Sequence, residues 1–130
     1  MTLGRLSEAA ALALECGRDN PKLLLDSYHL YKGGSPFEGV SLLRGECLPV
    51  FHINDWPAQP PREAIDDKQR VYPGDGVAPL GELYRRLAAV GFDGWLSLEL
   101  FNESYWKSAP LETAREGLEK TRMTVERAFE

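Results

Sequence analysis

The chain has 130 residues, of which 43% are hydrophobic and 27% are charged, and its formal net charge is −5. This composition is typical of a globular domain and excludes a disordered or fibrous protein. The acidic balance argues against a nucleic-acid-binding surface, and no apolar stretch approaches the roughly 20 residues of a membrane helix. We therefore expect neither nucleic acid nor membrane as a partner. With no signal-peptide pattern at the N-terminus, a cytoplasmic protein is expected.

Apolar residues at helical spacing alternate along the chain with short apolar runs. The first predicted helix covers residues 6–16, and a short run at residues 22–26 predicts a strand buried on both faces. A second helix is predicted to begin at Ser35, because Ser35 as N-cap, Pro36 at N1 and Glu38 at N3 form a capping box. We expect that helix to end at Gly45.

The second half of the chain repeats the pattern after a long polar connection. Residues 49–54 predict a second strand, and the proline-containing connection at residues 55–77 is of a length that is usually functional or disordered. A helix over residues 80–90, a strand over 94–100 and a last helix over 110–129 follow. The resulting order, αβαβαβα, predicts an α/β fold with parallel strands in a single domain over residues 1–130.

Each predicted strand is apolar until its carboxyl end, where a metal-ligating residue type stands. Asp26 ends the first strand and His29 follows it, His52 lies in the second strand, and Glu99 ends the third. In parallel α/β folds the carboxyl ends of the strands meet at the ligand-binding edge. Strand alternation also places His52 and Asn54 on one face, opposite the apolar residues. We therefore expect these polar side chains to converge.

Each of these residues also has an ordinary structural explanation. An aspartate at a strand end often caps a turn or helix, a histidine in an apolar strand is often a hydrogen-bonded core residue, and a buried glutamate often pairs with arginine. Three such residues at equivalent strand ends favour a shared cation, because burying two carboxylates together is costly without one. Two oxygen donors and one nitrogen suit one divalent ion, and Mn²⁺, Mg²⁺, Zn²⁺ and Co²⁺ all remain open.

Four motifs give the chain a family resemblance. They are D-S-Y-H from Asp26, F-H-I-N-D from Phe51, D-K-Q-R-V-Y-P-G-D-G from Asp67, and G-F-D-G-W-L-S-L-E-L-F from Gly91. On these motifs the chain resembles the xylose-isomerase-like superfamily of TIM barrels, and within it the branch of inosose (2-keto-myo-inositol) isomerases. The resemblance implies a partial (β/α)8 TIM barrel, made of the last three βα units preceded by a helix.

The resemblance also implies roles for individual residues. Asp26, His52 and Glu99 would bind one divalent metal, His29 and Arg70 would contact the substrate, and Glu99 would be one of two acid–base carboxylates. The other carboxylate of the family lies on the fifth strand. The predicted elements begin at a position that resembles the fifth helix, so we expect the isolated chain to hold only part of the site. A complete barrel needs about 250 residues.

The expected function is that of a divalent-metal-dependent isomerase or epimerase of a ketose, sugar phosphate or inosose, acting by proton transfer through an enediolate. The alternative is a non-catalytic binding or interaction module derived from the barrel. A repair nuclease of the same superfamily is disfavoured, because it would need further histidine ligands and the chain has only two histidines. We expect a sugar or cyclitol as small-molecule partner, and a homo-oligomer or a partner chain that supplies the missing strands.

Overall fold

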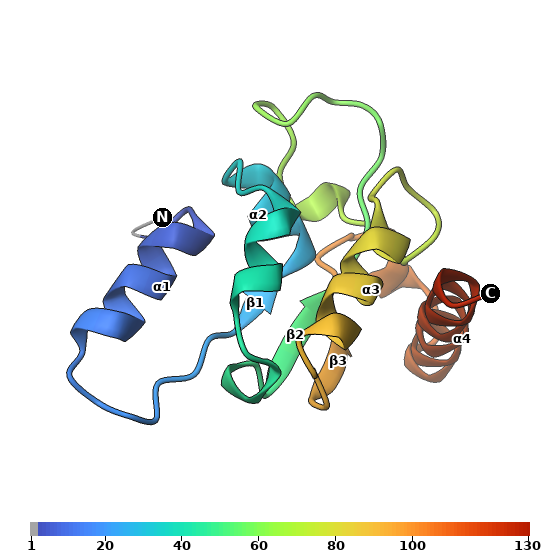
Figure 1. Cartoon of the computed structure of the whole chain (residues 1–130). Coiled ribbons are helices and arrows are strands. Elements are labelled where there is room, and N and C mark those ends of the chain that lie inside the picture. Colours follow the sequence, from blue (N-terminus) through green and yellow to red (C-terminus); the bar gives the residue numbers. More distant parts are fainter. Residues whose placement is uncertain (1–2) are drawn as a thin grey trace.

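Three short segments of the chain form one parallel sheet in the computed structural model, which describes residues 3–130 (Figure 1). The strands are β1 (Leu25–Asp26), β2 (Val50–Ile53) and β3 (Trp95–Leu98), and they lie in the order β1-β2-β3. The α-helices are α1 (Leu6–Glu15), α2 (Ser27–Lys32), α3 (Leu80–Ala89) and α4 (Pro110–Ala128). Short 3-10 helices lie at Phe37–Leu42 (η1), Gly45–Cys47 (η2), Asp67–Gln69 (η3) and Tyr105–Lys107 (η4).

The apolar face of the sheet packs under helices. Phe51 and Ile53 of β2 are fully buried there and share a core with Leu83 of α3 and Val40 of η1. These residues alternate in sequence with His52, as the two-residue period of a strand requires. Because Phe51 and Ile53 face the helices, His52 must face the other side of the sheet.

The register of the sheet aligns the carboxyl ends of the three strands. Asp26 lies beside His52, and His52 lies beside Ser97, so Glu99 follows just past the end of β3. The ladder extends to that position, since the Glu99 N–H donates to the Ile53 carbonyl over 3.3 Å. The α/β architecture with parallel strands, predicted from the alternating elements, is confirmed.

Near the first strand one helix was not predicted, and one predicted helix start was wrong. The chain forms the helix α2 directly after Asp26, and the Asp26 side chain caps it by accepting from the His29 N–H. Ser35 does not cap its own helix, because its hydroxyl accepts from the Leu6 N–H and so caps α1 across the fold. The segment after Ser35 forms only the 3-10 helix η1. A tertiary partner has replaced the local capping box.

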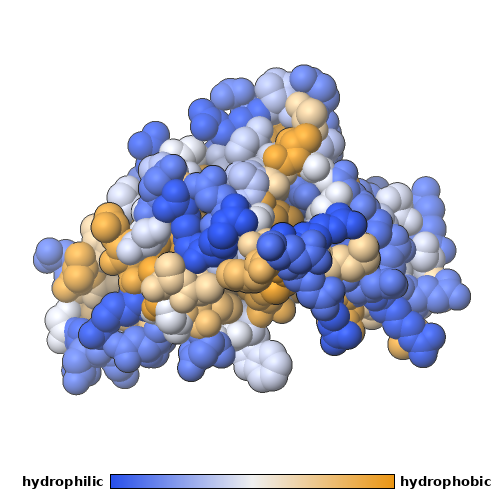
Figure 2. Space-filling view, turned by 45° about the vertical axis from the view of Figure 1, so that its right-hand side comes forward, coloured by the Kyte–Doolittle hydropathy of each residue, from blue (hydrophilic) through white to orange (hydrophobic). Residues whose placement is uncertain are grey.

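The opposite face of the sheet is open, and so are both of its edges. Leu24 next to β1 is 60% exposed and Trp95 of β3 is 78% exposed, although both are large apolar side chains. In Figure 1, α1 lies beyond β1 at one end of the sheet, and α4 lies at the other end, on the side of β3. Figure 2 shows apolar side chains reaching the surface between the polar ones.

Among residues 3–130, none of the helices combines the length and the apolar composition that crossing a bilayer requires.

Candidate metal centre

Asp26 is the most buried carboxylate of the centre, and its hydrogen bonds fix its orientation. It is 6% exposed at the end of β1. Its Oδ1 accepts from the His29 N–H over 3.0 Å, and its Oδ2 accepts from the Arg70 guanidinium over 3.2 Å. The first bond holds the carboxylate against the start of α2. The second makes Asp26 a partner of the only fully buried arginine among the described residues.

Asn54 connects the three strands behind the site. Its side-chain amide donates to both oxygens of Asp26 at 3.2 Å and to the Glu99 carbonyl at 3.3 Å. Its Oδ1 accepts from the Ser27 hydroxyl and from the Tyr28 N–H. A buried amide that uses both its ends in this way rigidifies its neighbours. Asn54 was not among the predicted site residues, although it shares a strand face with His52.

Glu99 and His52 approach each other on the open face of the sheet. The His52 Nδ1 lies 3.2 Å from Glu99 Oε1 and 3.8 Å from Asp26 Oδ2. Both side chains are partly accessible, with 21% of His52 and 32% of Glu99 exposed. The three residues predicted as ligands are therefore brought together, and they face solvent on one side.

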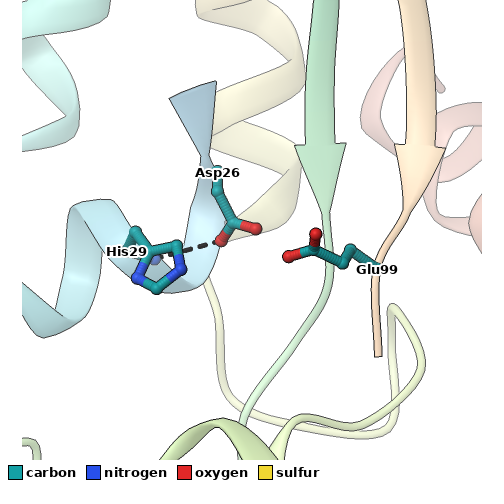
Figure 3. Close-up of side chains that lie close together, drawn as sticks. All are labelled: Asp26, His29 and Glu99. Carbon is teal, nitrogen blue, oxygen red and sulfur yellow. Dashed lines mark hydrogen bonds between the residues drawn. The ribbon is translucent and has the colours of Figure 1, made fainter. Parts of the chain in front are cut away.

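Asp26, His29 and Glu99 also form a cluster of their own. One ligating atom from each lies within 4.8 Å of the others, so these three could hold a metal ion (Figure 3). In Figure 3 the carboxylates of Asp26 and Glu99 point toward each other from neighbouring parts of the fold. The sequence predicted that His29 contacts the substrate. In the structure both His29 and His52 lie close enough to the two carboxylates to be the nitrogen ligand.

Arg70 lies between the carboxylates. It is 1% exposed, and its NH1 donates to Glu99 Oε2 over 2.7 Å as well as to Asp26. Its NH2 contacts Asp67 Oδ1 and lies 2.9 Å from His29 Nε2. The guanidinium also stacks over the Tyr28 ring at 4.6 Å. In this arrangement Arg70 is a buried counter-ion, and little of it is open to a substrate.

The surroundings shift two pKa values at the centre. Burial acts against the charged form of Arg70, but the Asp26 charge and the hydrogen bonds to Asp67 and Glu99 outweigh it, so the pKa of Arg70 is raised. Burial, together with the nearby charge of Asp67, raises the pKa of Tyr28 to about 12. Tyr28 therefore stays a neutral hydrogen-bond donor, and its hydroxyl donates to the Ile65 carbonyl.

The charge of the centre fits a divalent cation. Three carboxyl groups, from Asp26, Asp67 and Glu99, contact the single guanidinium of Arg70. The excess of negative charge in a partly buried site favours a further cation. Carboxylate oxygens with one imidazole nitrogen are a donor set that first-row divalent metals accept.

We expect the substitution Arg70→Ala to lower the free energy of unfolding by about 3–5 kcal/mol, because it leaves buried carboxylates without their partner. Arg70→Lys should recover part of the loss, since it keeps the charge but not the planar fork. Urea denaturation measures both. Arg115→Ala, an exposed arginine of α4, is the matched control. A loss below 1 kcal/mol for Arg70→Ala would show that Arg70 is not needed as a counter-ion.

The loop aromatics near the centre mostly pack among themselves. Trp56 is buried and stacks on Tyr31 with ring centroids 4.3 Å apart. Tyr72 stacks on Tyr105, also at 4.3 Å, and donates its hydroxyl toward the Thr113 carbonyl of α4. These contacts are those of structural packing.

The geometry now described defines a class of protein: part of a parallel α/β barrel, with polar residues gathered at the carboxyl ends of its strands. Residues 1–123 match the profile of the family described as xylose isomerase-like TIM barrel. This chain belongs to that family, and the fold class predicted from the motifs is confirmed.

Individual relatives agree with this assignment. The chain is 32% identical over 128 residues to an inosose isomerase of Bacillus licheniformis, covering 98% of this chain and 46% of the relative. It is 31% identical over 124 residues to an inosose isomerase of Bacillus subtilis, covering 95% of this chain and 43% of the relative. The chain thus spans less than half the length of these curated relatives.

Solved structures show the same fold. A crystal structure of IOLI protein with a binding zinc atom superposes with a TM-score of 0.90 at 29% identity, over 98% of this chain and 45% of that one. A xylose isomerase domain protein from Alicyclobacillus acidocaldarius gives a TM-score of 0.83 at 28% identity, over 96% and 44% of the two chains. This chain therefore corresponds to under half of each of those two chains.

Proposed function

We propose that this chain carries the Asp26, His52 and Glu99 centre of a divalent-metal-dependent isomerase or epimerase acting on a ketose, sugar phosphate or inosose. One observation carries the proposal. The side chains of these residues, from the ends of three neighbouring strands, converge so that the His52 Nδ1 is within 3.8 Å of both carboxylates. Mn²⁺, Mg²⁺, Zn²⁺ and Co²⁺ are all consistent with this donor set.

His52 is a better nitrogen ligand than His29 in this arrangement. A guanidinium has no hydrogen-bond acceptor, so the contact from Arg70 requires His29 Nε2 to be the acceptor. The proton of a neutral His29 then lies on Nδ1, and neither ring nitrogen has a free lone pair. His52 Nδ1 faces both carboxylates without such competition. We therefore assign the metal to Asp26, His52 and Glu99, and keep His29 as a polar contact for the substrate.

The proposed chemistry is proton transfer next to a carbonyl. A divalent cation acts as a Lewis acid toward the ketone and its neighbouring hydroxyl when it is bound. Glu99 would take the proton from the carbon next to the ketone, or return it to the adjacent carbon, and a second carboxylate would perform the other transfer. His29 would orient the substrate hydroxyls. Arg70, which is 1% exposed, would act indirectly by holding Glu99 in place through its bond to Oε2.

The relatives support the substrate class. Both curated relatives compared above are named inosose isomerases, and one superposed structure is described as having a bound zinc atom. A cyclitol or sugar with a ketone is the class of small molecule that this proposal assigns to the site. Its metal could accordingly be zinc, although the donor set also accepts the other three ions.

We also propose that another chain supplies further strands to the sheet, because residues 1–130 would form a single domain that is only part of a barrel. A groove of about 220 Å³ lies between α1 and β1, lined among others by Leu6, Leu24 and Asp26. A second groove, of about 340 Å³, lies beside the other edge strand and is lined among others by Leu98 and Trp106. Unpaired strand edges of this kind accept additional strands. A second copy or a partner chain would supply them.

The alternative function, a non-catalytic interaction module, is favoured by the same open surface. Large exposed apolar side chains such as Leu24 and Trp95 are typical of an interface. A module of this kind would bind its partner without needing the charge of Glu99.

Deuterium exchange distinguishes the two functions. We would incubate the chain with 2-keto-myo-inositol and a divalent metal in D₂O, alone and with the N-terminal half of a Bacillus inosose isomerase. NMR would follow deuterium at the carbons next to the ketone. The isomerase proposal predicts metal-dependent exchange in the complemented sample and little with the chain alone. If the complex forms but no exchange is seen with any of the four metals, the interaction module is the better account.

A further inference from the structure

Asp55 is a buried carboxylate that the proposed chemistry does not use. It is 1% exposed and follows Asn54 at the end of β2. Within residues 3–130, no lysine, arginine or histidine pairs with it, since none of the ion pairs includes Asp55. A buried carboxylate without a cation needs strong hydrogen bonds to offset its desolvation.

Those hydrogen bonds come from the backbone of one loop. Asp55 Oδ2 accepts from the N–H groups of Gly74 at 3.0 Å and Gly76 at 3.1 Å. Its Oδ1 accepts from the N–H groups of Ala78 at 2.8 Å and Trp56 at 2.7 Å. The carboxylate thus gathers three alternate amides of the segment 74–78. A carboxylate that accepts this many N–H bonds is an anchor for the chain around it.

The backbone of Asp55 holds the start of the same loop. Asp55 and Val71 form an antiparallel bridge, with N–H to carbonyl distances of 3.0 and 2.9 Å. Val71 directly follows Arg70, whose own carbonyl accepts from Asn102 over 3.1 Å. The position from which the Arg70 side chain reaches the carboxylates is therefore set by contacts on both sides of its peptide.

The loop packs so closely against Asp55 that position 76 has no room for a side chain. A Cβ on Gly76 would lie 2.3 Å from Asp55 Oδ1 and 2.2 Å from the Trp56 carbonyl. Only a residue without a side chain allows the backbone to approach the carboxylate this closely. Gly74 and Gly76 of the P-G-D-G run therefore form one hydrogen-bonded unit with the Asp55 carboxylate.

We infer that Asp55 is a positioning residue, which fixes the loop at residues 71–78 and thereby holds the Arg70 guanidinium between Asp26 and Glu99. The part of this inference that concerns the reaction rests on the proposed function. The placement of Arg70 does not, because it is a property of the protein without any metal or substrate.

The test replaces Asp55 by asparagine, which keeps the shape. Each carboxylate oxygen accepts from two backbone N–H groups, so the amide NH₂ in place of either oxygen removes two of the four bonds. We expect the amides of Gly74, Gly76 and Ala78 to lose at least about tenfold in protection from hydrogen exchange. We also expect the side-chain NMR signals of Arg70 and the ring signals of His29 to shift, with no metal present.

Asp75→Asn is the matched control, because it makes the same chemical change in the same loop. Asp75 is partly exposed and pairs with Lys120, and we expect neither effect from its substitution. Gly76→Ala is the second variant, in case Asp55→Asn does not fold, since it pushes the loop off the carboxylate without removing the charge. It should reproduce the Arg70 and His29 shifts.

Loss of amide protection with unchanged Arg70 and His29 signals would overturn the inference, because Asp55 would then serve the loop alone. Unchanged protection would overturn it as well. If the protein binds Zn²⁺, Asp55→Asn should change the affinity in the wild-type background but not in Arg70→Ala. If no Zn²⁺ binds at all, the proposed function fails while the NMR result on Asp55 still stands.

Discussion

Replacing Glu99 by glutamine is expected to weaken divalent-metal binding by at least about 100-fold and to abolish isomerase activity. Loss of a hydrogen-bonding group outside the ligand shell alone costs about 10–100-fold in metal affinity, and Glu99 is proposed as a direct ligand. The amide keeps an oxygen that Arg70 can donate to, so the fold should survive. Isothermal titration with Zn²⁺ and the deuterium-exchange assay measure the two effects.

Glu103→Gln provides the control for this substitution. Glu103 is exposed, pairs with Lys68 over 2.6 Å and lies four residues further along the chain. It loses the same charge outside the centre, so we expect its metal affinity to stay within about twofold of the wild type. Equal metal affinity for Glu99→Gln and the wild type would remove Glu99 from the ligand set.

The second large effect concerns assembly of the isolated chain. At micromolar concentration we expect sedimentation to give a mass well above the 14.6 kDa of one chain. The physical reason is the open sheet, with two unpaired edges and with Leu24 and Trp95 exposed on one face. Three strands per copy give six in a dimer, fewer than the eight of a barrel, so a homodimer would close differently from the family fold.

A matched pair of tryptophan substitutions locates the association surface. Trp95→Lys should weaken association by about 30-fold or more, since a tryptophan at the centre of an interface contributes over about 2 kcal/mol. Trp106→Lys makes the same change in η4 at a side chain that is 66% exposed, and should have a smaller effect. A monodisperse monomer that melts cooperatively would contradict the assembly proposal. It would mean that the open face is stable in water.

The sequence predicted the sheet well because its signals were local. The short apolar runs around Leu25, Phe51 and Leu96 led to three parallel strands, and the period of two correctly put His52 opposite Phe51. The helix α2 was missed because its six residues are too few to show helical periodicity. The capping signal at Ser35 was misleading, since its hydroxyl binds a group 29 residues away.

The site was predictable to the extent that strand ends determine it. The convergence of Asp26, His52 and Glu99 was predicted because each stands at or near the end of a strand, and strand order brings such ends together; their role as metal ligands stays a prediction. The burial of Arg70 could not be predicted in the same way. It depends on a contact between Arg70 and Asp26, which lie 44 residues apart in the sequence. Asn54 could have been found, because the alternation that placed His52 also places Asn54 on its face.

The most direct test of the central claim is a crystal structure of the protein with Zn²⁺, read by anomalous scattering at the zinc edge. Our account predicts a single strong peak at about 2.0–2.2 Å from His52 Nδ1 and from one oxygen each of Asp26 and Glu99. It also predicts that His29 stays outside coordination distance, with its Nε2 still facing Arg70. A peak coordinated by His29 in place of His52, or no ordered zinc between the two carboxylates, would contradict the assignment.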